Sequence, residues 1–554
     1  MVDFDVIVLG TGAAGLTAAI MAHDGGARVG LFEKAETVGG TSAWSGGQIW
    51  IPNNPHELAA GRQDSRDKAL TYLMSLSHGM IDPLMAEAYV DTGPEMIRYL
   101  EAKTPVCFCA VPDFPDYHPE FPGGLPEGGR TLECPPFPYG ELGEWRDRVG
   151  VSPYYPDFTY TIGETTLGKS VPTPAPPEVK EQRKRNDERG MGLALVGRLL
   201  RGCLDRGIEP RPSCRAIELA MMDGAVAGVR FEGPDGPFTI GAKAVILATG
   251  GFEWNPEMIR AFTRGPLTHP VSIRTNTGDG LKMAMRVGAM LGNMREAWWM
   301  PVIEVPTEVN PMGRQLLTYE RTMPGSLMVN RHGKRFTNEA SNYNAFGAAF
   351  HEQDVSRFEY ANLPCWLIFN QDFYAKWPFV GGLSDAFTGG ARPPQWIARA
   401  DSLAELAARV GIDPAGMENS VATFNAYAEA GEDPEFRRGE SANDLWWGDP
   451  EHRGSKRATL GPIGEGPYYA IEVKSGALGT KGGPKTDTDA RVLDVDGRPI
   501  PGLYAAGNVM ASPMGMTYGG AGGTLGPGMV FGYRAGRDAG RRFALSSAAN
   551  EEVA

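Results

Sequence analysis

The stretch FDVIVLGTGAAG, residues 4–15, opens the chain and decides its fold. Residues 4–9 form a short apolar, β-branched run typical of a buried strand, and the Ala-rich residues 16–23 are typical of a helix. Three glycines stand between them in G-x-G-x-x-G spacing. Gly10 permits a tight turn, Gly12 lets the backbone approach a ligand, and Gly15 lets the helix pack closely on the strand. The sequence therefore predicts a strand–turn–helix unit that begins an α/β domain.

A second strand and an acidic residue complete the pattern. Residues 28–32 are typical of a strand, and Glu33 follows at close to the roughly 20-residue interval expected after the glycines. The helix N-terminus offers N–H groups and a partial positive charge to a pyrophosphate, and Glu33 can accept the hydroxyls of an adenosine ribose. The pattern indicates dinucleotide binding but leaves NAD and FAD open, because both share the ADP half.

Other segments favour FAD. The loop GGTSAWSGG, residues 39–47, is dense in small residues and hydroxyls. Such a loop lets a planar ring lie against the backbone while hydroxyl and N–H groups meet a ribityl chain and a phosphate. AVILATGG at 244–251 and PGLYAAGN at 501–508 both read as buried strands that end in glycine turns. The cofactor site is therefore expected to be assembled from distant segments.

These segments, together with TGDG at 277–280, resemble the FAD-dependent oxidoreductases of the fumarate reductase and succinate dehydrogenase flavoprotein type over nearly the whole chain. The resemblance implies an α/β fold, with a discontinuous Rossmann-type FAD-binding domain interrupted by an α+β substrate-capping domain. We place the FAD-binding domain at 1–290 and 466–554 and the capping domain at 291–465. Residues 328–339 resemble part of that cap.

Some members of this family attach the flavin covalently through a His in the first glycine-serine loop. Residues 39–47 contain no His, so noncovalent FAD is expected. The helix that follows Gly523 is expected to aim its positive N-terminal end at the flavin pyrimidine. The residues expected to hold the cofactor are Gly10, Gly12, Ala13, Ala14, Gly15, Glu33, Lys34, Gly40, Thr41, Ser42, Gly46, Gly47, Ala216, Gly250, Asp279, Gly507, Asn508, Gly523 and Leu525.

The late segment MGMTYGGAGG, residues 514–523, separates two reactions within the family. Dicarboxylate reductases resemble one another in H-G-x-N-R-L-G-G-N at this place, where Arg can hold a carboxylate through paired bonds. That His and Arg are absent here, which disfavours fumarate reduction. The segment instead resembles 3-ketosteroid Δ1-dehydrogenases, which polarise a ring ketone with a Tyr hydroxyl and a Gly N–H. The matching residues are Tyr518 and Gly522, although Gly519 replaces the proline that usually follows the Tyr.

The same resemblance implies a base. Tyr319, in a Tyr-x-Arg…Pro-Gly setting, resembles the proton-abstracting Tyr, and Tyr117 resembles the Tyr that assists it, with His118 beside it. An unperturbed Tyr has a pKa near ~10, so a base at neutral pH needs such help. The expected reaction is 1,2-desaturation of a 3-ketosteroid. The base removes the α proton, two donors stabilise the enolate oxygen, and the β hydrogen leaves as hydride.

Composition limits the classes of molecule that the protein is expected to bind. The 554 residues carry 53 Lys and Arg against 67 Asp and Glu, a net charge of -14, which argues against nucleic acid. Six scattered cysteines suit a reducing cytosol, and no metal site is expected. The N-terminus lacks the features of a secretory signal and the chain has no apolar run long enough to span a membrane, so a cytoplasmic protein is expected. The basic residues of 178–189 leave peripheral contact with anionic lipid open.

The expected partners are a small hydrophobic ketone, a steroid in the leading hypothesis, and an external electron acceptor such as a quinone or oxygen. Three alternatives stay open. One is desaturation of another cyclic ketone, and another is reduction of an activated double bond as in fumarate reductases. The last is a flavoprotein subunit that passes electrons within a membrane-bound assembly.

Overall fold

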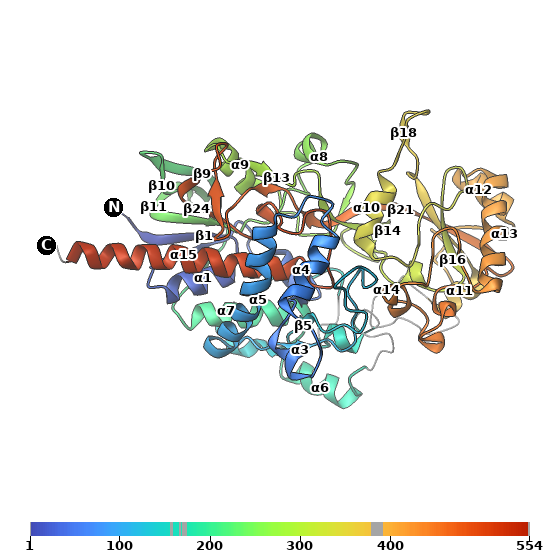
Figure 1. Ribbon diagram of the computed structural model, residues 1–554, viewed down its shortest axis with the longest axis horizontal. Helices are drawn as coiled ribbons and strands as arrows, with labels where there is room; N and C mark the ends of the chain where they lie inside the picture. Colours follow the sequence, from blue (N-terminus) through green and yellow to red (C-terminus); the bar gives the residue numbers. More distant parts are fainter. Residues whose placement is uncertain (1, 156–158, 166–167, 169–173, 378–391, 552–554) are drawn as a thin grey trace.

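Two β-sheets organise the chain (Figure 1). The computed structural model describes residues 2–155, 159–165, 168, 174–377 and 392–551. The first sheet lies at the end of the molecule where both termini are found, and the second lies at the opposite end with its own helices. Segments from the two ends of the sequence meet in the first sheet, so this part of the molecule is discontinuous, as predicted.

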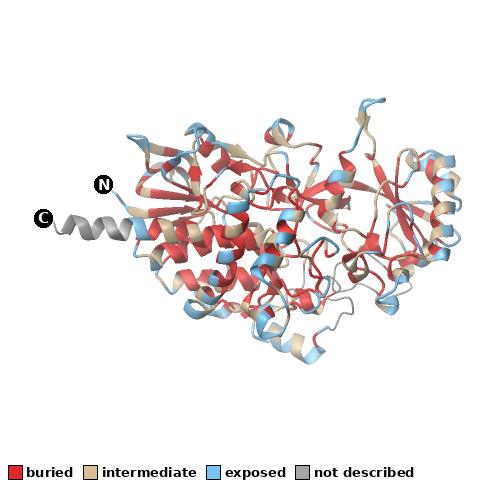
Figure 2. Ribbon diagram, in the orientation of Figure 1, coloured by how far each residue is buried: buried red, intermediate tan, exposed pale blue. Residues whose placement is uncertain are grey.

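The first sheet has the parallel core of a Rossmann-type fold. β1 (Phe4–Leu9) pairs in parallel with β2 (Val29–Phe32) and β11 (Gly236–Leu247), and β11 pairs in parallel with β24 (Pro499–Ala505). The order is β23-β24-β11-β1-β2-β8, with β23 (Arg491–Leu493) and β8 (Pro210–Arg211) at its edges. Residues 6–8 are fully buried, which fits strands covered on both faces (Figure 2). The predicted α/β class is confirmed.

Two helices run together beneath this sheet. α1 (Ala13–Asp24) packs along α15 (Leu525–Glu551), with α7 (Met191–Leu204) on its other side (Figure 1). Glycines at every fourth position of α15 make the close approach possible. A Cβ on Gly532 would lie 2.4 Å from the Ala14 carbonyl oxygen, and one on Gly536 would lie 2.3 Å from that of Ala18. Because the two helix backbones are in direct contact, the N-terminus of α1 and the N-terminus of α15 are fixed relative to each other.

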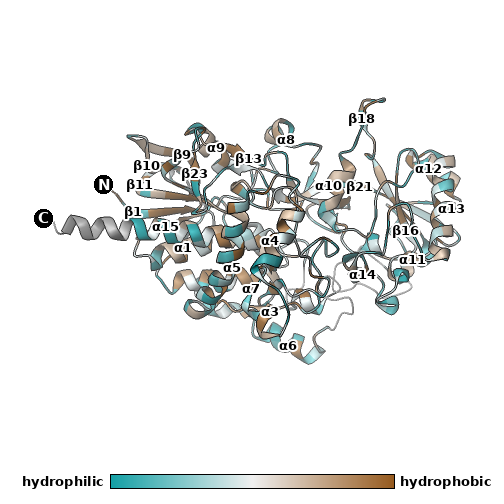
Figure 3. Cartoon of the chain, in the orientation of Figure 1, coloured by the Kyte–Doolittle hydropathy of each residue, from teal (hydrophilic) through white to brown (hydrophobic). Residues whose placement is uncertain are grey.

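The second sheet forms the cap. Its main path runs β15 (Arg314–Leu316), β14 (Ala297–Glu304), β21 (Tyr468–Thr480), β19 (Cys365–Asn370) and β16 (Ser326–Asn330), with antiparallel pairs throughout. α12 (Leu403–Val410) and α13 (Pro414–Ala430) cover it with their buried faces and expose the other side (Figure 2). The strands of both sheets carry the hydrophobic residues, as the brown strands near β1 and β11 show in Figure 3.

The cap sheet extends beyond the boundary expected at residue 465. β21 lies between β14 and β19 and follows that boundary in sequence, so its residues complete the cap before the chain returns to the first sheet. This placement favours an end of the inserted segment near Thr480 instead of 465. Across the described ranges, none of the helices has the length and hydropathy that crossing a membrane requires.

Candidate active site

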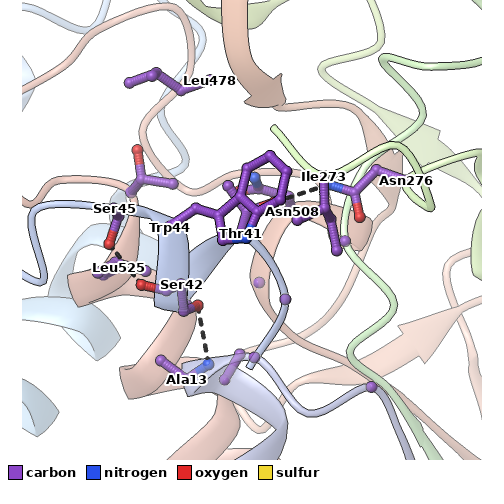
Figure 4. Close-up of a pocket in the computed structure, with 18 of the residues that line it drawn as sticks. Ala13, Thr41, Ser42, Trp44, Ser45, Ile273, Asn276, Leu478, Asn508 and Leu525 are labelled. Atoms are coloured by element: carbon purple, nitrogen blue, oxygen red, sulfur yellow. Dashed lines mark hydrogen bonds between the residues drawn. The ribbon is translucent and has the colours of Figure 1, made fainter. Parts of the chain in front are cut away.

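A large cavity lies between the two sheets. Leu9 at the end of β1, Leu316 on β15 and Leu478 on β21 all line it. Its lining extends from the glycine loop after β1, through residues 40–48, to the cap strands β15 and β21. Figure 4 shows part of the wall, with Ala13 and Ser42 on one side and Leu478 on the other. The cavity therefore joins the glycine-loop end of the first sheet to the cap.

Most residues expected to hold the cofactor do line this cavity. They are Gly10, Gly12, Ala13, Ala14, Glu33, Lys34, Gly40, Thr41, Ser42, Gly46, Gly47, Ala216, Gly250, Asp279, Gly507, Asn508 and Leu525. Gly15 and Gly523 are not among the described lining residues. A Cβ on Gly15 would lie 2.0 Å from the Gly10 carbonyl oxygen, so this glycine brings α1 onto the strand, as its spacing predicts.

The start of α1 forms one end of the cavity. Gly12 occupies the N-cap position without a side-chain cap, and the Ser42 hydroxyl accepts a hydrogen bond of 3.0 Å from the Ala13 N–H (Figure 4). Glu33 accepts from the Thr11 N–H at 3.0 Å and from the Thr11 hydroxyl at 2.6 Å. These bonds fix the end of β2 against the glycine loop and keep the helix N-terminus open to an anion.

Opposite charges gather at the same end. The Lys34 ammonium lies 2.9 Å from the Asp279 carboxylate, which Arg215 also contacts at 2.9 Å. Burial alone would raise the pKa of Asp279, but the hydrogen bonds from Arg215 and Lys34 hold it below its usual range. Asp279 is therefore ionised at neutral pH, and the ion pairs join the loop around 275–279 to the end of β2.

The donor set fits FAD. Gln48 Nε2 and Thr249 Oγ1 are buried at the wall without a hydrogen-bond partner in the described part of the chain. An unpaired buried polar atom is unfavourable by about 1–3 kcal/mol, so these atoms call for a polar ligand. Thr524 and Leu525 bring the start of α15 to the wall as well. Two helix N-termini, unsatisfied polar atoms and glycine turns suit a molecule with two phosphates and a ring rich in acceptors.

Three phenols meet at the other end of the cavity. The hydroxyl of Tyr117 donates to that of Tyr343 at 3.0 Å, and Tyr343 is in turn a hydrogen-bond partner of Tyr518. The ring centroids of Tyr117 and Tyr518 are 5.1 Å apart, and those of Tyr343 and Tyr518 are 5.5 Å apart. Thr524 donates a hydrogen bond of 3.1 Å to the Tyr518 oxygen. Because that oxygen already accepts a proton, the Tyr518 hydroxyl can donate its own to a ligand.

Gly522 supplies the second expected donor. It lines the cavity with φ +97°, and a Cβ there would lie 2.5 Å from the Ile49 backbone. Its N–H makes no hydrogen bond within the described residues. Only glycine fits this position, and its amide is free to bind a carbonyl oxygen.

Tyr319 is not among the described residues of the cavity wall, although its neighbour Thr318 is. Tyr319 is buried and begins the short 3-10 helix η3 (Glu320–Thr322). Tyr343 occupies the place that sequence reasoning gave to Tyr319, next to Tyr117. Arg321 donates to the carbonyls of Glu339 and Ser341, and so holds the loop that carries Tyr343.

The structure fixes Tyr343 next to an ion-pair anchor that the sequence alone does not reveal. Glu339 lies in the segment assigned to the cap, and the ion pairs of its carboxylate with Arg335 at 2.9 Å and Arg438 at 3.1 Å hold its pKa at about 2 despite burial. Tyr343 follows this anchored Glu four residues later. A Tyr close to a buried ion-pair anchor has a fixed position, which a proton-transfer residue requires. Tyr154, Tyr155 and Trp447 also line the cavity and were not predicted.

The phenol end is uncharged. Glu33, Lys34 and Asp279 are the charged groups among the described lining residues, and all three belong to the end near α1. No described lining residue is an Arg or a His. Burial raises the pKa of Tyr117 and of Tyr343 well above the usual range and that of Tyr518 in the same direction. The phenols are therefore neutral at pH 7 and suit a neutral carbonyl group.

Comparison with known proteins gives consistent results. The FAD binding domain family matches residues 5–525. The chain is 40% identical to 4-oxocyclohexanecarboxylate 2-dehydrogenase of Sinomonas cyclohexanicum, over 96% of this chain and 92% of that one. It is 38% identical to 3-oxosteroid 1-dehydrogenase of Mycobacterium tuberculosis, over 96% and 97%. The crystal structure of 3-ketosteroid delta1-dehydrogenase from Sterolibacterium denitrificans in complex with 1,4-androstadiene-3,17-dione superposes with TM-score 0.86 at 35% identity, over 97% and 99%.

Proposed function

Because the chain belongs to the FAD binding domain family, we propose that it is an FAD-dependent dehydrogenase that introduces the 1,2 double bond of a 3-ketosteroid. The observation that carries the proposal is the junction of Tyr518, Tyr343, Tyr117 and the Gly522 amide at an uncharged end of the cavity. Relatives that oxidise the carbon–carbon bond beside a ring ketone support it, as does the ketosteroid dehydrogenase structure.

Tyr518 and Gly522 bind the ketone oxygen. The Tyr518 hydroxyl donates one hydrogen bond, since Thr524 already donates to its oxygen, and the Gly522 N–H donates the other. Loss of the α proton develops negative charge on the ketone oxygen, and two fixed donors in a buried site stabilise it. Neutral donors suffice because the substrate itself carries no charge at this end.

Tyr343, in place of Tyr319, removes the α proton. Its hydroxyl lies beside Tyr117 and beside Tyr518, the residue that binds the ketone oxygen. The proton passes to the oxygen of Tyr343 in its minor phenolate form, and the Tyr117 hydroxyl, 3.0 Å away, is placed to donate to that form. Gly12, Ser42, Glu33 and the start of α15 would hold FAD noncovalently, and the bound flavin would supply the acceptor for the β hydrogen as hydride. An external quinone-like acceptor or oxygen would take up the electrons.

The described wall disfavours reduction of a dicarboxylate. A fumarate-type substrate needs cationic side chains to hold its carboxylates, and the phenol end offers none among the described residues. Arg321 is the nearest candidate for binding a carboxylate. Its guanidinium already donates hydrogen bonds to the carbonyls of Leu317, Glu339 and Ser341. Desaturation of a smaller cyclic ketone remains the second candidate, because a relative at 40% identity is a 4-oxocyclohexanecarboxylate 2-dehydrogenase.

Anaerobic mixing of the purified holoenzyme with 4-androstene-3,17-dione tests the proposal. The yellow absorbance of FAD should bleach as the steroid is oxidised to its 1,4-diene. Bleaching by 4-oxocyclohexanecarboxylate alone would assign the second candidate. Reoxidation of chemically reduced protein by fumarate, with no bleaching by either ketone, would contradict both.

A further inference from the structure

Two arginine side chains lie against the same indole ring, that of Trp254, beside the cavity. The guanidinium of Arg274 lies 5.4 Å from the ring centroid of Trp254, and that of Arg314 lies 5.1 Å from the same centroid. The ring itself is fixed, because its Nε1–H donates to the Ser272 carbonyl and hydroxyl at 3.1 Å. Both cations are therefore held against the same rigid ring.

No described carboxylate neutralises this pair within ion-pair distance, in a protein whose net charge is -14. Arg314 donates to two carbonyls, those of Met312 and Pro270. Glu304, which faces Arg314 across the β14–β15 pair, is engaged by His269 at 3.0 Å. Burial and then the charge of Arg274 lower the pKa of Arg314, against the opposite effects of Tyr154 and Glu304. An anion bound to the guanidiniums would therefore stabilise the pair.

Both arginines belong to segments that line the cavity. Arg314 and Leu316 are two positions apart on β15 and therefore lie on the same face of the strand, and Leu316 is at the wall. Arg274 stands between Ile273 and Thr275, which also line the cavity, and Figure 4 shows Ile273 beside the Trp44 indole. Neither arginine is itself among the described lining residues, so the pair borders the part of the wall formed by Ile273, Thr275 and Leu316, which we call the rim.

The third residue next to the arginine pair is Tyr154. It lines the cavity, and its ring centroid is 6.4 Å from that of Trp44. Its hydroxyl is buried without a hydrogen-bond partner among the described residues. Arg314 and Arg274 are the two cations that act on it. A buried hydroxyl without a described partner, next to two guanidiniums without a described carboxylate partner, is the pattern of a site for an acceptor with negative charge.

We propose that Arg274, Arg314 and the Tyr154 hydroxyl form a carboxylate-binding site for the end of the substrate opposite its ketone. This inference rests on the proposed function and deepens it. The preferred substrate class is a cyclic ketone with a distal carboxylate, such as a 3-ketosteroid with an acidic side chain. The carboxylate stays at the rim, where the guanidiniums bind it, while the uncharged end of the molecule enters among the phenols.

Paired probes that differ only in charge test the site. The holoenzyme is mixed anaerobically with 3-oxochol-4-en-24-oate or with its methyl ester, and the dissociation constant is taken from the concentration dependence of flavin bleaching. Arg274→Gln is the main variant, because Arg274 is exposed and makes no hydrogen bond that the fold needs. We expect about tenfold weaker binding of the acid, the scale of one charge-assisted contact, and an unchanged constant for the ester. Tyr154→Phe should weaken the acid more than the ester as well.

Arg230→Gln serves as the control, since it removes the same charge from an exposed strand of the first sheet. Equal effects of Arg274→Gln on acid and ester, or equal effects of Arg230→Gln on the acid, would overturn the site. A loss of FAD affinity in Arg274→Gln, measured by fluorescence titration of the apoprotein, would assign the arginine to the cofactor and also overturn it. Failure of both probes to bleach wild-type flavin would overturn the proposed function itself, whereas bleaching by the ester with no charge preference would overturn the carboxylate site alone.

Discussion

The hydroxyls of Tyr117 and Tyr343 lie 3.0 Å apart, although 226 positions separate the two residues in the sequence. One comes from the first domain and the other from the cap. Their hydrogen bond can form only when the cap is seated on the first domain, so the base and its assistant are assembled by closure of the same interface that encloses the substrate.

Replacing Tyr518 by Phe should remove one oxyanion donor. We expect kcat to fall by about 10²- to 10³-fold, because the enolate oxygen would keep the Gly522 amide alone. The absorbance spectrum of bound FAD should not change. Tyr99→Phe, whose hydroxyl bonds to Asp24 away from the cavity, is the matched control. Near-normal turnover of Tyr518→Phe would rule out this role.

Tyr343→Phe and Tyr319→Phe should behave differently. Stopped-flow measurement of flavin reduction is expected to show almost no reduction in Tyr343→Phe, with the ketone still bound, because the α proton has no acceptor. Tyr319→Phe should reduce flavin within a few-fold of wild type, since Tyr319 is not at the described wall. The opposite order of rates would return the base to Tyr319.

The rate of flavin reduction should rise with pH. Burial raises the pKa of Tyr343 well above its usual range, so the base form is a small fraction at neutral pH and grows about tenfold per pH unit below that pKa. We expect the reductive rate constant to increase from pH 6 to pH 10 without a plateau, over roughly the range below the ~10 of a free Tyr. A plateau near pH 7 would require another base.

Gly522→Ala should lose activity because the added methyl group displaces the backbone of the loop. The new methyl group would lie 2.5 Å from the Ile49 backbone, and the residue would keep φ +97°, so the loop must move and carry its amide away from the ketone. We expect kcat to fall at least tenfold, on the scale of a lost donor. Gly224→Ala has a similar positive φ with open space around it, and should keep wild-type turnover. Equal activities would show that the amide of Gly522 does not bind substrate.

Gly532→Val tests the contact between α1 and α15. A side chain here would meet the Ala14 carbonyl, at 2.4 Å for the Cβ, and force the helices apart. We expect a loss of about 1–3 kcal/mol of unfolding free energy, as for an overpacked core, together with weaker FAD binding because the start of α1 shifts. Arg541→Val places the same side chain on the exposed surface of α15 and should change neither. Unchanged thermal denaturation of Gly532→Val would contradict the close packing.

Local sequence predicted the cofactor end well. The G-x-G-x-x-G spacing, Glu33 and the glycine turns of residues 39–47 and 501–508 each specify their own backbone, so the strands and turns appear where expected. The phenol end depends on contacts between distant segments, and no local pattern reports them. Tyr518 and Gly522 were predicted because one short segment, residues 514–523, resembles the ketosteroid enzymes, and both residues line the cavity. Tyr343 was missed because its partners, Tyr117 and Arg321, lie far away in sequence.

The boundary of the cap shows the same limit. Residues 468–480 have the alternation of buried and exposed positions that many strands share, and their sequence does not indicate which sheet they join. Their place between β14 and β19 is decided by the registers of both neighbours, which only the folded chain reveals. Rim residues such as Arg274 gave no signal either, because an isolated arginine in a loop is usually solvated.

The packing of α15 against α1 has a consequence for biosynthesis. β1 and α1 leave the ribosome hundreds of residues before α15, the helix that completes the cofactor-binding surface around them. Until α15 has been translated, the preceding part of the chain lacks a complete binding site for the flavin. Flavin insertion should therefore be a late event in the life of the polypeptide, and pulse-labelled chains arrested before Gly528 should emerge colourless.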